Sequence, residues 1–282
     1  MIEPGGSAAR VRGTTVVLVA LAILAFAGNS LLARAALGTG QIGWGSFTAI
    51  RLAAGAAILL PWLLRGPRER PSWRGALALL VYCGAFSFAY VRLNAATGAM
   101  VLFAAVQATI LVAGALSGNR VRAIDLAGVA MAMTGVVVLI GGRAEAGPVL
   151  AMLGMVVAGI AWGLYSVLGR SAADPARRTA GNFLVAALVA APLPLLDAGP
   201  APALGGVALA IASGAFASGL GYVAWYRVVP RLPHATVGAA QLATPVVAAL
   251  AAAVLLGEPL TVRLAVAAAL ILGGIAATLR RA

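Results

Sequence analysis

The chain has 282 residues, of which 62% are hydrophobic and 10% are charged, and its mean hydropathy is +1.03. A water-soluble domain cannot bury that much apolar surface, so these values exclude a soluble protein and indicate an all-α integral membrane protein. The net charge of +13 does not indicate nucleic-acid binding, because the charges separate apolar runs and do not cover one soluble face.

The composition also excludes several kinds of chemistry. All 20 basic residues are arginines, so there is no lysine for a nucleotide-binding P-loop or for a Schiff base. The single cysteine, Cys83, and the single histidine, His234, exclude an intrachain disulfide and a cysteine or histidine metal cluster. We therefore expect no cofactor, no metal and no ATP-driven pump in this chain.

Ten apolar segments are long enough to cross a bilayer, which takes about 20 helical residues. In chain order they cover residues 14–34, 43–64, 74–92, 97–117, 124–141, 148–169, 180–196, 204–227, 235–256 and 263–280. The first segment also resembles a secretory signal, with AFA at 25–27 as a cleavage site. Its apolar run continues to Leu37, so we expect it to be retained.

The arginines predict the direction of the spans. Fifteen of them lie on the side of the N-terminus, four lie on the opposite side, and Arg51 lies within the second span. Because positive residues are enriched on the cytoplasmic side, this distribution predicts that both termini are cytoplasmic.

The two halves of the chain resemble each other. FAGNSLLAR at 26–34 aligns without gaps with WGLYSVLGR at 162–170, and Ala96-Thr97, Gly118 and Gly135 match Ala235-Thr236, Gly257 and Gly274. Because each half holds five spans, an odd number, the second half enters the membrane from the opposite side. We expect two inverted five-helix repeats, at 1–142 and 143–282, with a substrate path where they meet.

Several motifs resemble one family of membrane proteins. The two aligned segments, the WGSFTAIRLAAGA stretch of the second span and the Ala-Thr, Gly-Glu-Pro-Leu-Thr and Gly-Gly pattern of 235–274 resemble the EamA-type exporters of the drug/metabolite transporter superfamily. Among these exporters the chain is most similar to the aromatic amino acid exporters. In the first half Asn119-Arg120 replaces Glu258-Pro259, so we do not expect Glu258 to couple transport to an ion.

The resemblance carries implications for fold and function. It implies a basket of ten helices in which spans 1, 3, 4, 6, 8 and 9 surround a central cavity and spans 5 and 10 are peripheral. It also implies export of amino acids, aromatic and otherwise apolar, and of related metabolites from the cytoplasm across the cell inner membrane by alternating access.

Polar and aromatic side chains at mid-span are candidates for the substrate site, because an amide or hydroxyl in hydrocarbon is costly unless it faces protein or water. The candidates are Asn29, Ser30, Tyr82, Phe86, Phe103, Gln107, Trp162, Tyr165, Ser166, Tyr222 and Gln241, together with Phe26, Phe216, Ser218 and Thr244. Flat apolar walls with few hydrogen-bonding groups suit an apolar amino acid. Gln107, at the centre of its span, is the strongest candidate, with an interhelical hydrogen bond as the alternative.

Arg51 has two interpretations. The one we favour is structural, with the side chain snorkelling outward or donating to helix-end carbonyls, and the alternative is contact with a substrate carboxylate. All seven acidic residues lie in loops or at span ends, which is compatible with a facilitator driven by the substrate gradient. By position, Trp44, Trp62, Trp73 and Trp225 predict an interfacial belt.

Other functions stay open at this point. A multidrug exporter or a lipid-linked sugar flippase would share the fold, although phosphate-bearing substrates favour several deep basic residues and only Arg51 qualifies. An intramembrane enzyme would need a nucleophile and a base within reach, and the spans hold no such pair. We expect a monomer surrounded by membrane lipid, with small-molecule substrates as partners and no nucleic acid.

Overall fold

The computed structural model describes residues 5–64, 70–118, 122–140, 146–169, 172–198, 201–228 and 234–279, and all regular elements in these ranges are helices. They are α1 (Gly5–Leu37), α2 (Trp44–Leu64), α3 (Trp73–Tyr90), α4 (Ala95–Leu116), α5 (Ala123–Ile140), α6 (Ala146–Gly169), α7 (Pro175–Ala190), η1 (Leu193–Leu196), α8 (Leu204–Ala212), η2 (Ser213–Leu220), α9 (Gly221–Val228), α10 (His234–Leu256) and α11 (Val262–Leu279). Because α8, η2 and α9 are continuous, they form one span, which we call the α8–α9 span.

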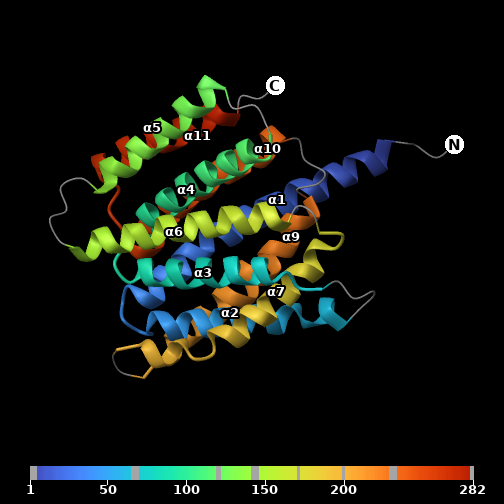
Figure 1. The fold of residues 1–282 in the computed structure, drawn as a ribbon, viewed down its shortest axis with the longest axis vertical. Helices are drawn as coiled ribbons and strands as arrows, with labels where there is room; N and C mark the ends of the chain where they lie inside the picture. Colours follow the sequence, from blue (N-terminus) through green and yellow to red (C-terminus); the bar gives the residue numbers. More distant parts are fainter. Residues whose placement is uncertain are drawn as a thin grey trace.

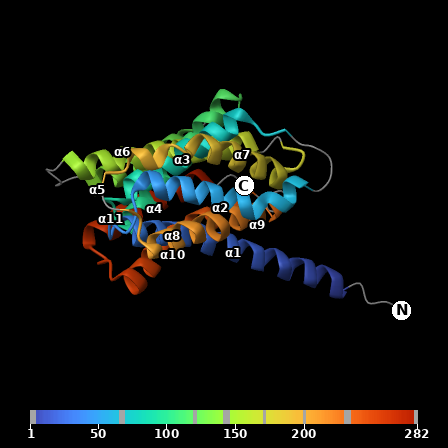
Figure 2. The same ribbon diagram turned by 90° about the horizontal axis from the view of Figure 1, so that it is seen from below.

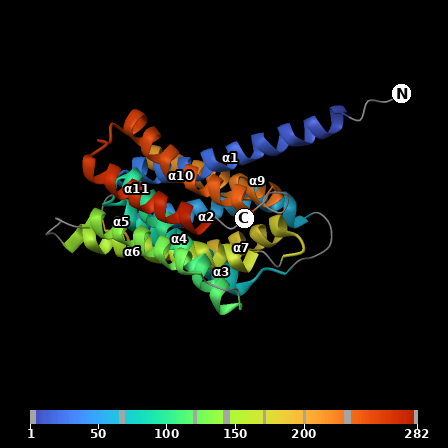
Figure 3. The same ribbon diagram turned by 90° about the horizontal axis from the view of Figure 1, so that it is seen from above.

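Within the described residues, each of the ten predicted segments contains a helix, and the all-helical fold is confirmed. Five of the described helices are long and apolar enough to cross a membrane by themselves, and shorter apolar helices lie in α5, α10 and α11. The N-terminal part of α1 extends beyond the other helices in two perpendicular views (Figures 1 and 2), and Figure 3 shows the same extension from above. The first helix is therefore longer at its N-terminus than the predicted segment of 14–34.

The limits predicted for the seventh span, 180–196, are wrong. Instead α7 starts at Pro175, where the Asp174 side chain accepts from the backbone N–H of Arg177 and caps the helix. The helix ends before Pro192, because proline cannot continue the helical hydrogen bonds, and the apolar residues that follow form the short 3₁₀ turn η1.

The helices pack in pairs that join the first half of the chain to the second. α5 packs along α11 and α2 along α7, while α3 packs on α6 and α1 on the α8–α9 span. Figure 1 shows α5 with α11 at the upper edge of the bundle and α2 with α7 at the lower edge. Spans 5 and 10 are therefore peripheral, as expected, and the centre is formed where α1, α3, α6 and the α8–α9 span meet.

The α8–α9 span approaches α2 unusually closely. A Cβ at Gly214 would collide with the carbonyl oxygen of Arg51, so the two helices touch through their backbones. This contact lies in η2, a π-helix, and π-helical turns are frequent at functional sites. η2 also carries Ser213 and Ser218, both fully buried, and so brings two hydroxyls to the centre of the bundle.

Candidate substrate site

Aromatic rings from four spans contact one another at the centre of the bundle. We call Phe26, Tyr82, Phe86, Trp162, Tyr165 and Tyr222 the ring cluster. Trp162 contacts rings of the three other spans. Its ring centroid lies 6.0 Å from that of Phe26, 5.0 Å from that of Tyr82 and 4.7 Å from that of Tyr222. The family resemblance implies an open central cavity at this place. Instead the rings of the cluster contact one another and fill the centre of the bundle, so the expected path is closed here in this conformation.

Arg51 of α2 points into the ring cluster. Its side chain is 0% exposed, and its Cζ atom lies 4.8 Å from the ring centroid of Phe86 and 5.1 Å from that of Tyr82. Nε donates to the Ser218 hydroxyl at 3.1 Å, and Nη2 donates to the Tyr82 hydroxyl at 3.2 Å. The snorkelling interpretation is therefore wrong, because the guanidinium points to the centre of the bundle.

Asn29 supplies a second polar group beside the same tyrosine. Its Nδ2 atom donates to the Tyr82 hydroxyl at 3.3 Å, and its Oδ1 atom accepts from the Ser213 hydroxyl. Both ends of the amide are paired and the side chain is only 2% exposed. An amide is tolerated in this apolar helix because it faces polar groups of α3 and η2.

Two buried polar groups of this site complete no hydrogen bond within the described part of the chain. They are Nη1 of Arg51 and the hydroxyl of Tyr222, whose ring packs against Trp162 in the ring cluster. Leaving a buried donor unpaired costs about 1–3 kcal/mol, and more when the group is charged. These two groups are therefore donors that a further polar group could satisfy.

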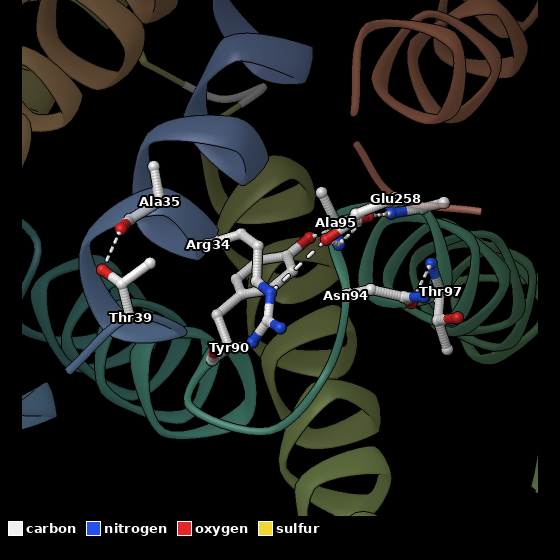
Figure 4. A network of polar contacts seen from close by, with 9 residues as sticks. Arg34, Ala35, Thr39, Tyr90, Asn94, Ala95, Thr97 and Glu258 are labelled. Atoms are coloured by element: carbon white, nitrogen blue, oxygen red, sulfur yellow. Dashed lines mark hydrogen bonds and ion pairs between the residues drawn. The ribbon is translucent and has the colours of Figure 1, made fainter. Parts of the chain in front are cut away.

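One end of the bundle is closed by Glu258, and we call it the Glu258 end (Figure 4). The Glu258 carboxylate follows α10 and accepts from the backbone N–H of Ala95 at 3.0 and 2.8 Å, in the first turn of α4. It also pairs with Nε of Arg34 at 3.4 Å. A carboxylate at a helix N-terminus is stabilising, so this contact fastens α10 to α4 and α1.

A second carboxylate closes the same end. Asp197, which follows η1, accepts from the backbone N–H groups of Gly45 and Ser46, both at 2.8 Å, in the first turn of α2. Glycine is needed at position 45, because a Cβ there would collide with the carbonyl oxygen of Leu193. Like Glu258, Asp197 thus links a loop of the second half to a helix of the first.

The opposite end, which we call the Arg178 end, is less tightly filled. A small cavity of about 10 Å³ there is lined by residues of α3, α6, α7 and α9 that include Tyr165, Arg178 and Tyr226, and an open pocket lies beside Trp62 and Arg177. Tyr165 belongs to both the first cavity and the ring cluster, where its ring stacks on Trp162 with centroids 5.6 Å apart. Tyr165 therefore lies between this small cavity and the ring cluster.

Comparisons with known proteins place the chain in a family. The EamA-like transporter family matches residues 149–280, which make up most of the second half. The uncharacterized protein PA1977 of Pseudomonas aeruginosa is 50% identical over 267 residues, which is 93% of each chain. This chain belongs to the EamA-like transporter family.

A solved structure has a similar fold along nearly the whole chain. A protein described only as "Crystal structure of protein" is 26% identical, with a TM-score of 0.69 over 96% of this chain and 100% of its own. The EamA-like family consists of membrane transporters of small molecules and not of enzymes, and its fold has ten helices. The ring cluster and Arg51 therefore form a candidate site for a transported molecule.

The structure brings many of the sequence-predicted candidates together. Asn29, Arg51, Tyr82, Phe86, Trp162, Tyr165 and Tyr222 contact one another as described, and Ser30 is buried on α1 beside Asn29. Ser166 donates to the carbonyl oxygen of Trp162 at 2.8 Å, so its hydroxyl is used within its own helix. Phe103 is buried on α4, whereas Gln107, the strongest candidate from the sequence, and Gln241 are half-buried, and none of the three is part of the ring cluster.

Two interpretations from sequence position are wrong. Phe216, a candidate path residue, is 62% exposed on the outer face of η2. Trp225, a candidate for the interfacial belt, is 7% exposed, with its ring centroid 5.6 Å from that of Phe26. Sequence reasoning also missed Ser213, for which the only signal was a second small polar residue in the same span as Ser218.

Proposed function

We infer that this protein exports amino acids with aromatic and other apolar side chains, and related small metabolites, from the cytoplasm across the inner membrane by alternating access. The observation that carries this proposal is the fully buried Arg51, held between aromatic rings with one N–H group that a ligand can use. Arginine binds carboxylates through paired, charge-assisted hydrogen bonds. The rings supply flat apolar walls for the rest of the substrate.

Contacts between α5 and α11 support two inverted halves, 1–142 and 143–282. A Cβ at Gly135 would meet Ala267 and Ile271, while a Cβ at Gly274 would meet Gly128 and Ala132. Gly128, Ala132 and Gly135 correspond to Ala267, Ile271 and Gly274, each 139 residues later. Contacts exchanged in this way arise when two similar units face each other across a two-fold axis.

The ring cluster has the same exchanged pattern. Phe26 and Trp162 hold the same position in the two aligned segments, and their rings contact each other. Phe26 also contacts Tyr222 of the eighth span, while Trp162 contacts Tyr82 of the third, which is the corresponding span of the first half. This pattern supports a substrate site at the interface of the two halves, where carriers with inverted repeats bind their substrates.

The arginine distribution supports an orientation for this site. With both termini in the cytoplasm, the Arg178 end faces the cytoplasm and the Glu258 end faces outward. A substrate would then enter past Tyr165, reach Arg51, and leave after the carboxylate contacts of Glu258 and Asp197 have separated. Alternating access requires such a closure at one end at a time.

The test is efflux from liposomes that contain the purified protein and labelled phenylalanine, leucine, lysine or glutamate, with and without a pH gradient. We expect phenylalanine and leucine to leave faster than lysine and glutamate. Arg51→Gln should lower their efflux by about tenfold to a hundredfold, because a charged hydrogen bond to the substrate is lost. Arg92→Gln, which changes an exposed arginine, is the matched control. An unchanged rate in Arg51→Gln, or no efflux of any of the four, would contradict the proposal.

A further inference from the structure

The charges around Arg51 point to a preference among the proposed substrates, which comprise amino acids and related small metabolites. We propose that the site prefers aromatic and apolar monocarboxylates that lack an amino group over the corresponding amino acids. This inference rests on the proposed function, because it assumes that Arg51 and the ring cluster bind the transported molecule. Its support comes from the partners of each polar group in the site.

The site has the groups that a carboxylate needs. Nη1 of Arg51 and the Tyr222 hydroxyl are buried donors that complete no hydrogen bond within the described residues, and a carboxylate has two oxygens to accept from them. The ion pairs of the described residues involve other arginines. All seven Asp and Glu residues of the chain lie outside the middle of the spans, so a bound anion would supply the counter-charge of Arg51.

Among the described residues, the site holds no carboxylate that could pair with an ammonium group. Asn29 Oδ1 already accepts from Ser213, and the Ser218 hydroxyl already accepts from Arg51. The Tyr82 hydroxyl accepts from both Asn29 and Arg51, so each of these three oxygens already has a partner, and none of them is a charged acceptor. A substrate ammonium would also be repelled by the guanidinium at low dielectric.

The aromatic faces do not compensate for this difference. The rings of Tyr82 and Phe86 already lie against the guanidinium, so their faces stabilise one cation and not a second. Phe26, Trp162 and Tyr222 contact each other as tilted or edge-on rings, and a flat apolar body inserted between them would exchange one aromatic contact for another. The site therefore fits an aromatic body that carries one negative charge.

The experiment is calorimetric binding to the full-length protein in detergent, with three probes of one shape: 3-phenylpropionate, phenylalanine and 2-phenylethylamine. Binding is measured because a weak acid can cross liposomes unaided. We expect 3-phenylpropionate to bind about tenfold or more tightly than phenylalanine, and the amine not to bind.

If phenylalanine binds equally or more tightly, the inference is wrong and the proposed amino acid export stands. If neither carboxylate binds and labelled amino acids do not leave liposomes, both proposals are wrong.

Two variants separate charge recognition from a structural effect. Asn29→Asp adds an acid of nearly the same shape beside Tyr82, so the preference should reverse toward phenylalanine. Tyr222→Phe removes one donor without changing charge and should weaken 3-phenylpropionate binding about fivefold to tenfold, as expected for one hydrogen bond. Phe216→Leu, on the exposed face of η2, is the matched control and should bind like the unchanged protein. If Tyr222→Phe retains full affinity, or if a folded Asn29→Asp keeps the original preference, the inference is wrong.

Discussion

The two ends of the bundle are held together in different ways. At the Glu258 end, carboxylates bind backbone N–H groups, and Gly45 lies against the backbone of Leu193. At the Arg178 end, cavities remain, and a Cβ at Gly169 would approach only the far end of a side chain, 2.8 Å from the Tyr226 hydroxyl. A side chain can change rotamer, whereas a packed backbone cannot yield locally. The Arg178 end also has one such contact, in which the backbone N–H of Ser72 donates to Asn182 Oδ1 at 2.9 Å, but we expect this end to need the smaller rearrangement to open.

The largest effect on stability is expected at Gly45. In Gly45→Ala the new methyl group collides with the Leu193 carbonyl, so we expect the free energy of unfolding to fall by about 2–3 kcal/mol. Thermal unfolding of the detergent-solubilised protein measures this loss. Gly84→Ala is the matched control, because a Cβ there meets nothing within 4 Å, and it should be neutral or slightly stabilising. If Gly45→Ala and Gly84→Ala lost equal free energy of unfolding, the close backbone packing at Gly45 would not stabilise the Glu258 end.

The next effect is expected at Glu258. Glu258→Gln removes the charge that faces the amides of α4 and Arg34, at a cost of about 2 kcal/mol. A weaker closure should also speed the labelling of Ala96→Cys, which is 2% exposed in the closed end, by a water-soluble maleimide. Cys83, 0% exposed, is an internal reference that should stay unlabelled. Unchanged labelling would mean that the Glu258 contact does not hold this end closed.

Arg34 should matter less than its partner. Its side chain is 27% exposed, so solvent screens the ion pair, and Arg34→Gln should cost only about 0.5 kcal/mol. Combining Arg34→Gln with Glu258→Gln tests their coupling, because the loss of a shared contact is not additive. Strictly additive losses in the double variant would show that the two residues act independently.

The smallest effect is expected at the Arg178 end. In Gly169→Ala the methyl group meets the tip of Tyr226, which can turn away, so the loss should stay below about 0.5 kcal/mol. The same thermal unfolding experiment as for Gly45→Ala compares the two ends directly. A loss as large as that of Gly45→Ala would mean that the Arg178 end is packed as rigidly as the Glu258 end.

Most of the fold could be predicted because apolar length and helix-ending residues determine a membrane span. The seventh span shows where this reasoning fails. The apolar residues of Leu193–Leu196 resemble the end of a helix, but Pro192 and Pro194 stop α7 and the chain turns. At its other end, Asp174 caps a first turn that holds Arg177 and Arg178, too polar for a hydropathy window to include.

Less of the site could be predicted, because sequence gives the depth of a residue in the membrane but not the direction of its side chain. Asn29 could be expected to face protein, since an amide in hydrocarbon needs a partner. The directions of Phe216 and Arg51 could not, because their helices touch other spans on faces that only tertiary packing defines. One signal for Arg51 existed: Thr48 and Gly55 lie three and four residues from it, on a helical face with a polar and a small residue, which is typical of close helix contact.

Arg51 also has no counterpart in the second half. The aligned segments are offset by 136 to 139 residues, so the matching positions are 187–190, and all four residues there are apolar. An antiparallel dimer of two identical half-length chains would set two guanidinium groups against the same rings, and their mutual repulsion would oppose assembly. When both halves are encoded in one chain, their sequences can diverge, so that a single arginine can lie at the centre of the bundle. In the proposed site, a single positive charge is therefore not available to a symmetric dimer of identical halves.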